Sequence, residues 1–271
     1  MSGARKDPLL LRIAAVGFTL LFIGVTVLLP LVSVFVQAFA KGFAGWWAAV
    51  SDPDTVSAIR MTLLAALGAV PLNTAFGIAA AWLVTKHRFP GRHLLVSLID
   101  LPFSVSPVIS GLVFVLLFGA QGTFGSWLQE HDIKIIFAWP AMILATAFVT
   151  FPFVARELIP VMEEMGTQDE EAAVMLGAGG WTIFRKITLP GIRWGLLYGV
   201  ILCNARAMGE FGAVSVVSGH IRGETNTLPL HAEILYNEYD FTGAFAVASL
   251  LTLLAGATVV VKLWLERRIA R

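Results

Sequence analysis

Long apolar runs dominate the pattern of this chain. Five of them contain no Asp, Glu, Lys, Arg or His: residues 13–36, 61–85, 101–129, 135–155 and 241–261. A helix that crosses a membrane needs about 20 mostly apolar residues. Residues 194–218 form a sixth candidate, interrupted by Arg206 and Glu210. We therefore predict an all-α polytopic membrane protein with six spans, at about residues 11–39, 59–85, 94–118, 135–159, 192–217 and 241–265.

Prolines inside these runs predict irregular helices, because proline removes a backbone hydrogen bond. Pro30 is expected to bend the first span, and Pro71 lies inside the second. The third span carries Pro102 and Pro107 among serines. Such irregularity at membrane depth is tolerated mainly where protein or a water-lined cavity surrounds it, so the third span is expected to be loosened.

Composition agrees with a membrane protein. Only 14% of residues are charged and 57% are hydrophobic, whereas a soluble domain has about 25% charged residues. The single cysteine, Cys203, excludes an internal disulfide and a paired-cysteine metal site. The basic N-terminus precedes a run too long for a signal peptide, so we interpret it as a retained span. Nothing suggests a second domain, a metal site or a nucleic-acid partner.

The basic residues are distributed unevenly between the two faces that six spans imply. One face holds 14 Lys and Arg residues and the other holds four. An excess of Lys and Arg marks the cytoplasmic side. The first set is Arg5, Lys6, Arg12, Lys86, Arg88, Arg92, Arg156, Arg185, Lys186, Arg193, Lys262, Arg267, Arg268 and Arg271. Both termini and the loop at about residues 163–190 are therefore expected in the cytoplasm.

That loop is the most polar part of the second half of the chain. It contains EEAAVMLGAGGWTIFRKITLP, from Glu170 to Pro190. Acids suit the start of a helix and Ala, Met and Leu favour its interior, so residues 170–176 are predicted to be helical. Gly177, Gly179 and Gly180 are expected to end or bend that helix before a second amphipathic stretch at 181–189. A helix hairpin lying on the membrane would have the same pattern.

The spacing in this loop resembles a known motif. Glu171, Ala172 and Ala173, then Gly177, then Ile187, Leu189 and Pro190 match the "EAA" motif of permease subunits of bacterial ABC importers. The resemblance implies a coupling helix whose Glu171, Ala172, Ala173 and Gly177 dock on a cytoplasmic ATPase. It also implies a homologous second permease, two ATPase subunits that hold ATP and Mg, and a periplasmic binding protein. The chain itself has no GxxxxGK[ST] loop, so we expect no enzyme activity and no cofactor in it.

A second resemblance concerns the substrate. The sequence NARAMGEFGA, residues 204–213, is similar to the fifth-span signature of oxyanion importer permeases. The continuation VSVVSGHIRGETNTLPLHAEILYNEYD and the third-span LPFSVSPVISGL resemble the W-type permeases of the sulfate/thiosulfate branch. This implies ATP-driven import of sulfate or thiosulfate across a bacterial inner membrane. The alternatives are a molybdate or tungstate permease, an ATP-independent anion transporter or channel, and a membrane subunit that transports nothing.

Several polar residues are candidates for the translocation pathway. Arg206 and Glu210 lie four residues apart, so on one helix they would share a face. They form either a gate for a dianion or an ion pair that only packs the span, and charges at membrane depth are costly enough for pairing alone to explain them. Weaker candidates are Ser104, Ser106, Ser110, Asn73 and Asp100; a structural role is the commoner explanation for each, and Asp100 is expected to pair locally near the cytoplasmic face. His220, Arg222 and His231 are expected to be solvated loop residues, with contact to substrate or a delivering protein as the alternative.

Overall fold

The computed structural model describes residues 9–269, and within that range every regular element is helical. Three helices lead in: α1 (Leu9–Ile23), α2 (Leu29–Ala38) and α3 (Gly42–Val50). The long helices are α4 (Pro53–Lys86), α8 (Trp139–Met165), α11 (Leu189–Met208) and α14 (Phe241–Ile269). The shorter ones are α5 (Arg92–Ser104), α6 (Pro107–Phe118), α7 (Gly125–Glu130), α9 (Gln168–Met175), α10 (Gly180–Ile183), α12 (Gly212–Ser218) and α13 (Leu228–Asn237). The predicted cytoplasmic positions of Arg5, Lys6 and Arg271, and of the side chains of Lys262, Arg267 and Arg268, lie outside the described part.

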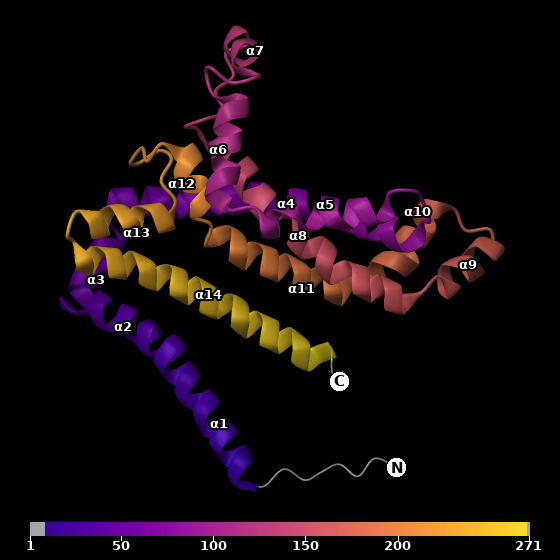
Figure 1. The fold of residues 1–271 in the computed structure, drawn as a ribbon, viewed down its shortest axis with the longest axis horizontal. Coiled ribbons are helices and arrows are strands. Elements are labelled where there is room, and N and C mark those ends of the chain that lie inside the picture. Colours follow the sequence, from indigo (N-terminus) through magenta and orange to yellow (C-terminus); the bar gives the residue numbers. More distant parts are fainter. Residues whose placement is uncertain (1–8, 270–271) are drawn as a thin grey trace.

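The four long helices run side by side and form the body of the molecule (Figure 1). One end of this bundle carries α9 and the other carries α3 and α13, and we call them the α9 end and the α13 end. The closest packing uses small residues: a Cβ on Gly77 of α4 would lie 2.6 Å from Val154 of α8. Small residues let helix backbones approach closely, which is how helices associate in membranes. The core at this contact contains Val154, Leu158, Met162 and Ile192.

Within residues 9–269, five helices are long and apolar enough to cross a membrane, and the bent pair α5–α6 makes a sixth if it counts as one span. The predicted third span is therefore not one straight helix. Pro107 starts a new helix after Val105 and Ser106, and α6 turns by 104° from α5. The prolines were expected to loosen this span, and they break it instead. Figure 1 shows α6 and α7 projecting away from the bundle.

The predicted fifth span also ends earlier in the chain than expected. We expected it to extend to residue 217, but α11 ends at Met208 and α12 begins at Gly212. At its other end, α11 continues a helix that starts at Gly180, so that 29 residues run without a sharp bend. The fourth span is shifted toward the α9 end, with α8 covering Trp139–Met165.

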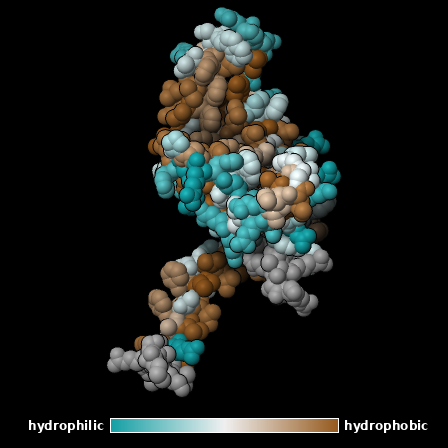
Figure 2. Space-filling model, turned by 90° about the vertical axis from the view of Figure 1, so that its right-hand side faces the viewer, coloured by the Kyte–Doolittle hydropathy of each residue, from teal (hydrophilic) through white to brown (hydrophobic). Residues whose placement is uncertain are grey.

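The first span forms an arm made of α1, a π-helical turn (η1, Gly24–Leu28) and α2, and it diverges from the bundle (Figure 1). Within its most apolar window no residue is buried. Pro30 does not bend the arm sharply. The π-helical turn just before it shifts the backbone pairing, with Leu29 N–H bonded to the carbonyl of Gly24. Figure 2 shows the α9 end face-on, with hydrophilic residues across its centre and brown apolar surface on α6 and the arm.

Candidate functional site

The loop after α8 forms the short helix that the sequence predicts. Helix α9 begins after Thr167, whose carbonyl accepts the Glu171 N–H at 2.9 Å and whose hydroxyl donates to the Glu171 carboxylate at 2.6 Å. Acidic residues fill its first turn, where the helix dipole favours negative charge. Gly177 ends it with φ +80°, a left-handed conformation that suits glycine.

The tip of this loop is an exposed apolar surface. Met175 is 87% exposed and Leu176 89%, and Val174 and Trp181 are also exposed. Large apolar side chains this open on a polar end of the molecule are typical of an interaction site. Sequence reasoning named Glu171, Ala172, Ala173 and Gly177, but it missed these four residues. The available signal was the run of three large apolar residues inside an otherwise polar segment.

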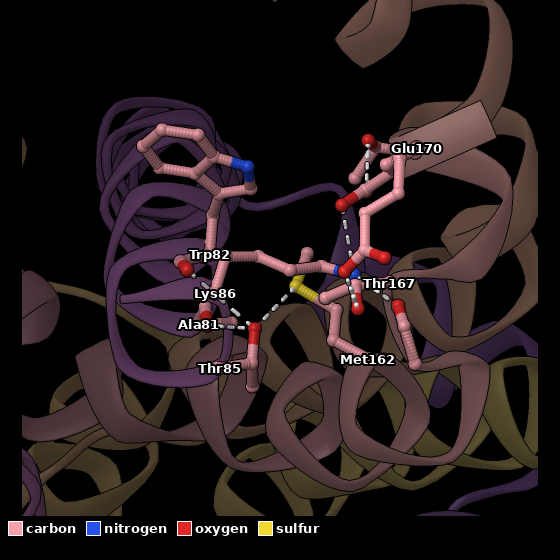
Figure 3. A network of polar contacts seen from close by, with 10 residues as sticks. Ala81, Trp82, Thr85, Lys86, Met162, Thr167 and Glu170 are labelled. Carbon is pink, nitrogen blue, oxygen red and sulfur yellow. Dashed lines mark hydrogen bonds and ion pairs between the residues drawn. The ribbon is translucent and has the colours of Figure 1, made fainter. Parts of the chain in front are cut away.

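The base of the loop is fixed by a buried ion pair. Lys86, the last residue of α4, lies 3.0 Å from the Glu170 carboxylate, with side-chain exposures of only 6% and 15%. Lys86 also donates to the carbonyl of Gly166, and Thr188 donates to the other Glu170 oxygen at 2.6 Å. Figure 3 shows Lys86 reaching from α4 toward Glu170. This Lys86–Glu170 clamp joins α4, the end of α8, α9 and the approach to α11.

The remaining motif residues lie apart from the exposed tip. Ile187 and Leu189 are half-buried, and Leu189 packs against the core cluster that contains Met162 and Ile192. Pro190 sits at the start of α11. The predicted coupling residues thus divide into two groups. Glu171, Ala172 and Gly177 are exposed on the loop, while Ile187 and Leu189 anchor the loop to a spanning helix.

The two helix breaks meet on another side of the bundle. Helix α12 packs against α6, and a Cβ on Gly212 would lie 2.9 Å from the Cβ of Pro107. A Cβ on Gly111 would lie 2.7 Å from the carbonyl of Ala213. The break in the third span and the break in the fifth span are therefore in direct contact, and glycine makes that contact possible.

Arg206 and Glu210 lie at this double break. They contact each other at 2.9 Å, but Glu210 follows the end of α11 instead of continuing it. Its side chain is 1% exposed, and its other oxygen accepts the Ala213 N–H at 3.0 Å, which caps α12. Arg206 is 37% exposed. The acid is thus fixed inside the protein while the guanidinium reaches the surface.

The serine and amide candidates have different surroundings. Ser104 and Ser106 are exposed at the break between α5 and α6, whereas Ser110 is buried and donates to the Ser106 carbonyl at 3.2 Å. Asn73 is buried between three long helices and donates to Thr150 at 2.8 Å. Asp100 is paired with Arg156 at 2.9 Å. Of this group, only Ser104 and Ser106 are open to a passing ligand.

One expectation about the α13 end is wrong. His231 was expected to be a solvated loop residue, but it is only 2% exposed and its Nε2 lies 3.1 Å from the Thr55 hydroxyl. Leu228 and Leu230 on α13 are also buried, so this part of the loop packs onto the bundle. His220 and Arg222 remain partly exposed and form ion pairs with Glu233 and Glu238.

Comparisons with known proteins identify the family. Residues 73–271 match the model of the binding-protein-dependent transport system inner membrane component. The sulfate transport system permease protein CysW of Escherichia coli strain K12 is 54% identical over 94% of this chain and 87% of its own length. CysW of Synechococcus elongatus is 51% identical over 100% and 95%. The sulfate transport system permease protein CysT of Escherichia coli strain K12 is 40% identical over 88% and 86%.

Solved structures agree on the fold. The crystal structure of a bacterial alginate ABC transporter, in complex with a periplasmic protein bound to an alginate pentasaccharide, superposes with a TM-score of 0.78 over 96% of this chain and 95% of that one. The sequence identity is 18%, so this likeness concerns the fold alone. The family model matches most of the chain, and the similar permeases align with nearly all of it. This chain therefore belongs to the family of binding-protein-dependent transport system inner membrane components.

Proposed function

We propose that this chain is the permease subunit of an ATP-driven ABC importer that moves sulfate, and the similar dianion thiosulfate, across the bacterial inner membrane. The observation that carries the proposal is the identity of 51–54% to sulfate transport permeases named CysW, over nearly the whole chain. In this account residues 1–271 form one permease domain, with the loop at about 163–190 as its coupling segment.

The exposed loop tip is the docking surface for the ATPase. Met175, Leu176 and Trp181 supply apolar area. Glu171 supplies a carboxylate that an arginine of the partner can bind with paired hydrogen bonds. ATP and Mg are held by two copies of that partner, because the chain has no phosphate-binding loop of its own.

Movement of the docked loop reaches the spanning helices through the Lys86–Glu170 clamp. A buried, hydrogen-bonded ion pair cannot separate cheaply. Displacing α9 therefore displaces the ends of α4 and α11 with it. Since α11 is one long helix that leads to the double break, a push at the α9 end changes the contact between Gly212 and Pro107.

The double break is the gate. Arg206 provides a guanidinium whose planar donors suit a tetrahedral oxyanion, and Glu210 neutralises it when no anion is present. Ser104 and Ser106 line the approach with hydroxyl groups. Closing and opening correspond to two packings of the α6–α12 contact, biased by ATP at one end and by a loaded binding protein at the other.

The orientation follows from charge. Lys86, Arg88, Arg92, Arg185 and Lys186 all belong to the α9 end, and an excess of basic residues marks the cytoplasmic side. The apolar arm of α1 and α2 and the exposed helix α6 need lipid or a second permease around them. A homologous subunit of the CysT kind fits this need, and the α13 end then faces the periplasmic sulfate-binding protein.

The test is uptake of labelled sulfate by proteoliposomes that hold the assembled complex, with binding protein outside and ATP inside. We expect uptake to require both ATP and the binding protein. Excess thiosulfate should block this uptake, and molybdate should not. Inhibition by molybdate or tungstate alone would assign the other oxyanion class. Uptake without ATP would indicate a secondary transporter, and a complex that hydrolyses ATP without taking up any of these anions would contradict the proposal.

A further inference from the structure

A second arginine lies within a helix long and apolar enough to cross a membrane, away from the double break. Arg156 belongs to α8 and pairs with Asp100 of α5: Nε lies 2.9 Å from one carboxylate oxygen and Nη2 lies 3.3 Å from the other. Its side chain is 57% exposed, and the Phe103 ring lies 5.2 Å from the guanidinium carbon. From sequence, Arg156 counted only as a basic residue of the cytoplasmic face.

The depth of Arg156 follows from helix geometry. It lies nine residues before the end of α8 at Met165, which is about 14 Å at the helical rise of 1.5 Å per residue. Asp100 lies eight residues after Arg92, the first residue of α5, which is about 12 Å. Arg92 pairs with Glu163 at the α9 end. The Arg156–Asp100 pair therefore lies about 12–14 Å along these helices from their ends at the α9 side.

The exposure of the Arg156 guanidinium indicates what kind of surroundings it has. A charge facing lipid is costly, so intramembrane arginines face a wet cavity or a protein neighbour. The more buried member of the pair is Asp100, at 35% exposure. In the Arg206–Glu210 pair the acid is likewise the less exposed partner, at 1% against 37% for the arginine. In both pairs the carboxylate holds the arginine from the protein side.

The pairing leaves hydrogen-bond donors free. A guanidinium has five N–H groups, and Asp100 occupies only the edge formed by Nε and Nη2. Within the described part of the chain no acceptor meets Nη1. A tetrahedral oxyanion has the acceptors and the charge that this open edge requires.

The two arginines are also staggered along the bundle. A Cβ on Gly199 of α11 would lie 3.2 Å from Val154 and 3.3 Å from Glu157 of α8, so Gly199 is level with Arg156. Arg206 lies seven residues further along α11, which is about 10 Å. Helix α5 connects the two levels, since it runs from Asp100 past Ser104 to the break at Pro107.

We propose that Arg156, held by Asp100, is a second binding station for a tetrahedral dianion, between the gate at Arg206 and the α9 end. This proposal rests on the proposed function and adds a site to it. The anion leaving Arg206 meets Arg156 next, and Asp100 then competes for the guanidinium and releases the anion toward the cytoplasm.

The experiment compares Arg156→Gln, Arg156→Lys and Asp100→Asn in the reconstituted complex, with Arg92→Gln as the control. Arg92 offers an ion pair of the same kind about 12 Å away. We measure sulfate taken up per ATP hydrolysed, and the inhibition of uptake by sulfate trapped inside. The expected result is a drop of about tenfold for Arg156→Gln, the effect of one lost charge-assisted contact. Arg156→Lys keeps part of the uptake and Arg92→Gln keeps all of it.

Asp100→Asn separates binding from packing. If Arg156 binds the anion, removing its counter-charge strengthens binding, so trapped sulfate inhibits uptake at a lower concentration than in the unmodified complex. If the pair only packs α5 against α8, Arg156→Gln and Asp100→Asn break the same contact and act alike, which would overturn the proposal. Unchanged sulfate uptake by the Arg156→Gln complex would also overturn the proposal. Failure of the proposed function would appear separately, as absence of sulfate uptake by the unmodified complex.

Discussion

At the scale of single residues, the Lys86–Glu170 clamp is the contact on which the proposed coupling depends most. Both side chains are nearly buried, and removing one partner of such a pair leaves an uncompensated charge that costs about 3–5 kcal/mol. We expect Lys86→Met and Glu170→Gln each to lower the melting temperature of the complex. The double variant, which leaves no isolated charge and keeps an acceptor for Thr188, should recover most of the loss. Thermal melts of all three test this, and additive losses would contradict the clamp.

Arg206 is the residue on which the proposed gate depends. If it gates the anion, Arg206→Gln lowers sulfate uptake per assembled molecule roughly tenfold, while ATP hydrolysis continues. Glu210→Gln is the matched variant, since it keeps the acceptor for the Ala213 N–H and loses the charge. Lower abundance with unchanged uptake per molecule would instead identify the pair as packing.

His231 makes the α13 end sensitive to acid. Burial lowers the pKa of His231 below its ordinary value of 6.5, and the nearby carboxylates of Asp54 and Asp52 oppose the shift. The Thr55 hydroxyl donates to the Ala49 carbonyl, so it accepts from His231 Nε2–H. No donor in the described part of the chain meets the buried Nδ1. Protonation would bury a charge with an unpaired N–H.

The sign of the pH effect follows from this lowered pKa. On acidification, His231 of the unfolded chain is protonated before His231 of the folded chain. The stability that the neutral, buried His231 contributes is therefore fully present above about pH 6.5 and is lost as the pH falls below that value. We expect the melting temperature of the complex to fall between pH 7 and pH 5.5, and His231→Gln to reduce that fall. A substitution in the exposed His220–Glu233 pair serves as the control. If the melting temperatures of the His231→Gln complex and the unmodified complex depend equally on pH, His231 is not the source of the acid sensitivity.

At the scale of elements, the contact between the two helix breaks depends on glycine. A methyl group on Gly111 would meet the Ala213 carbonyl at 2.7 Å, and overpacking of this kind costs about 1–3 kcal/mol. Gly111→Ala should therefore destabilise the complex. Gly256→Ala on α14 meets nothing within 4 Å and should be neutral or stabilise by about 0.5–1 kcal/mol. Melting curves compare the two, and equal effects would mean that the breaks do not pack as described.

Prolines act on the long helices in two ways. Pro30 and Pro190 each follow a π-helical turn, at Gly24–Leu28 and Phe184–Thr188, and the helix continues through both. Pro107 instead starts a new helix at 104° to the preceding one. The sequence predicts irregularity at Pro30 and Pro107, but the outcome depends on the packing partner. Helix α12 lies against α6 and holds the bend at Pro107.

At the scale of the whole molecule, the long apolar runs predicted the helical class, because such runs permit few other structures. The six predicted spans agree with the described helices if the bent pair α5–α6 counts as one span. The pattern from Glu171 to Pro190 predicted a short helix in this loop, and the structure has α9 there, since the residues that form it are close together in sequence. The Lys86–Glu170 and Asp100–Arg156 contacts join distant helices, and no local pattern reports them. The burial of His231 was missed for the same reason, because the packing of α13 onto α4 is a tertiary effect.

In the proposed mechanism, movement of the exposed loop passes through the Lys86–Glu170 clamp and helix α11 to the gate at the double break. Gly177 is the most direct place to interrupt it. The residue has φ +80° and open space around it, and Asp there adds strain and a charge beside Met175 and Leu176 without touching any spanning helix.

The measurement is sulfate uptake and ATP hydrolysis by the reconstituted complex that carries Gly177→Asp, against a Gly256→Ala control. We predict that Gly177→Asp loses most ATP-driven uptake, at least about tenfold, while the permease keeps its melting temperature within a few degrees and the control transports normally. Undiminished ATP-driven uptake by the Gly177→Asp complex would contradict the coupling role of this loop.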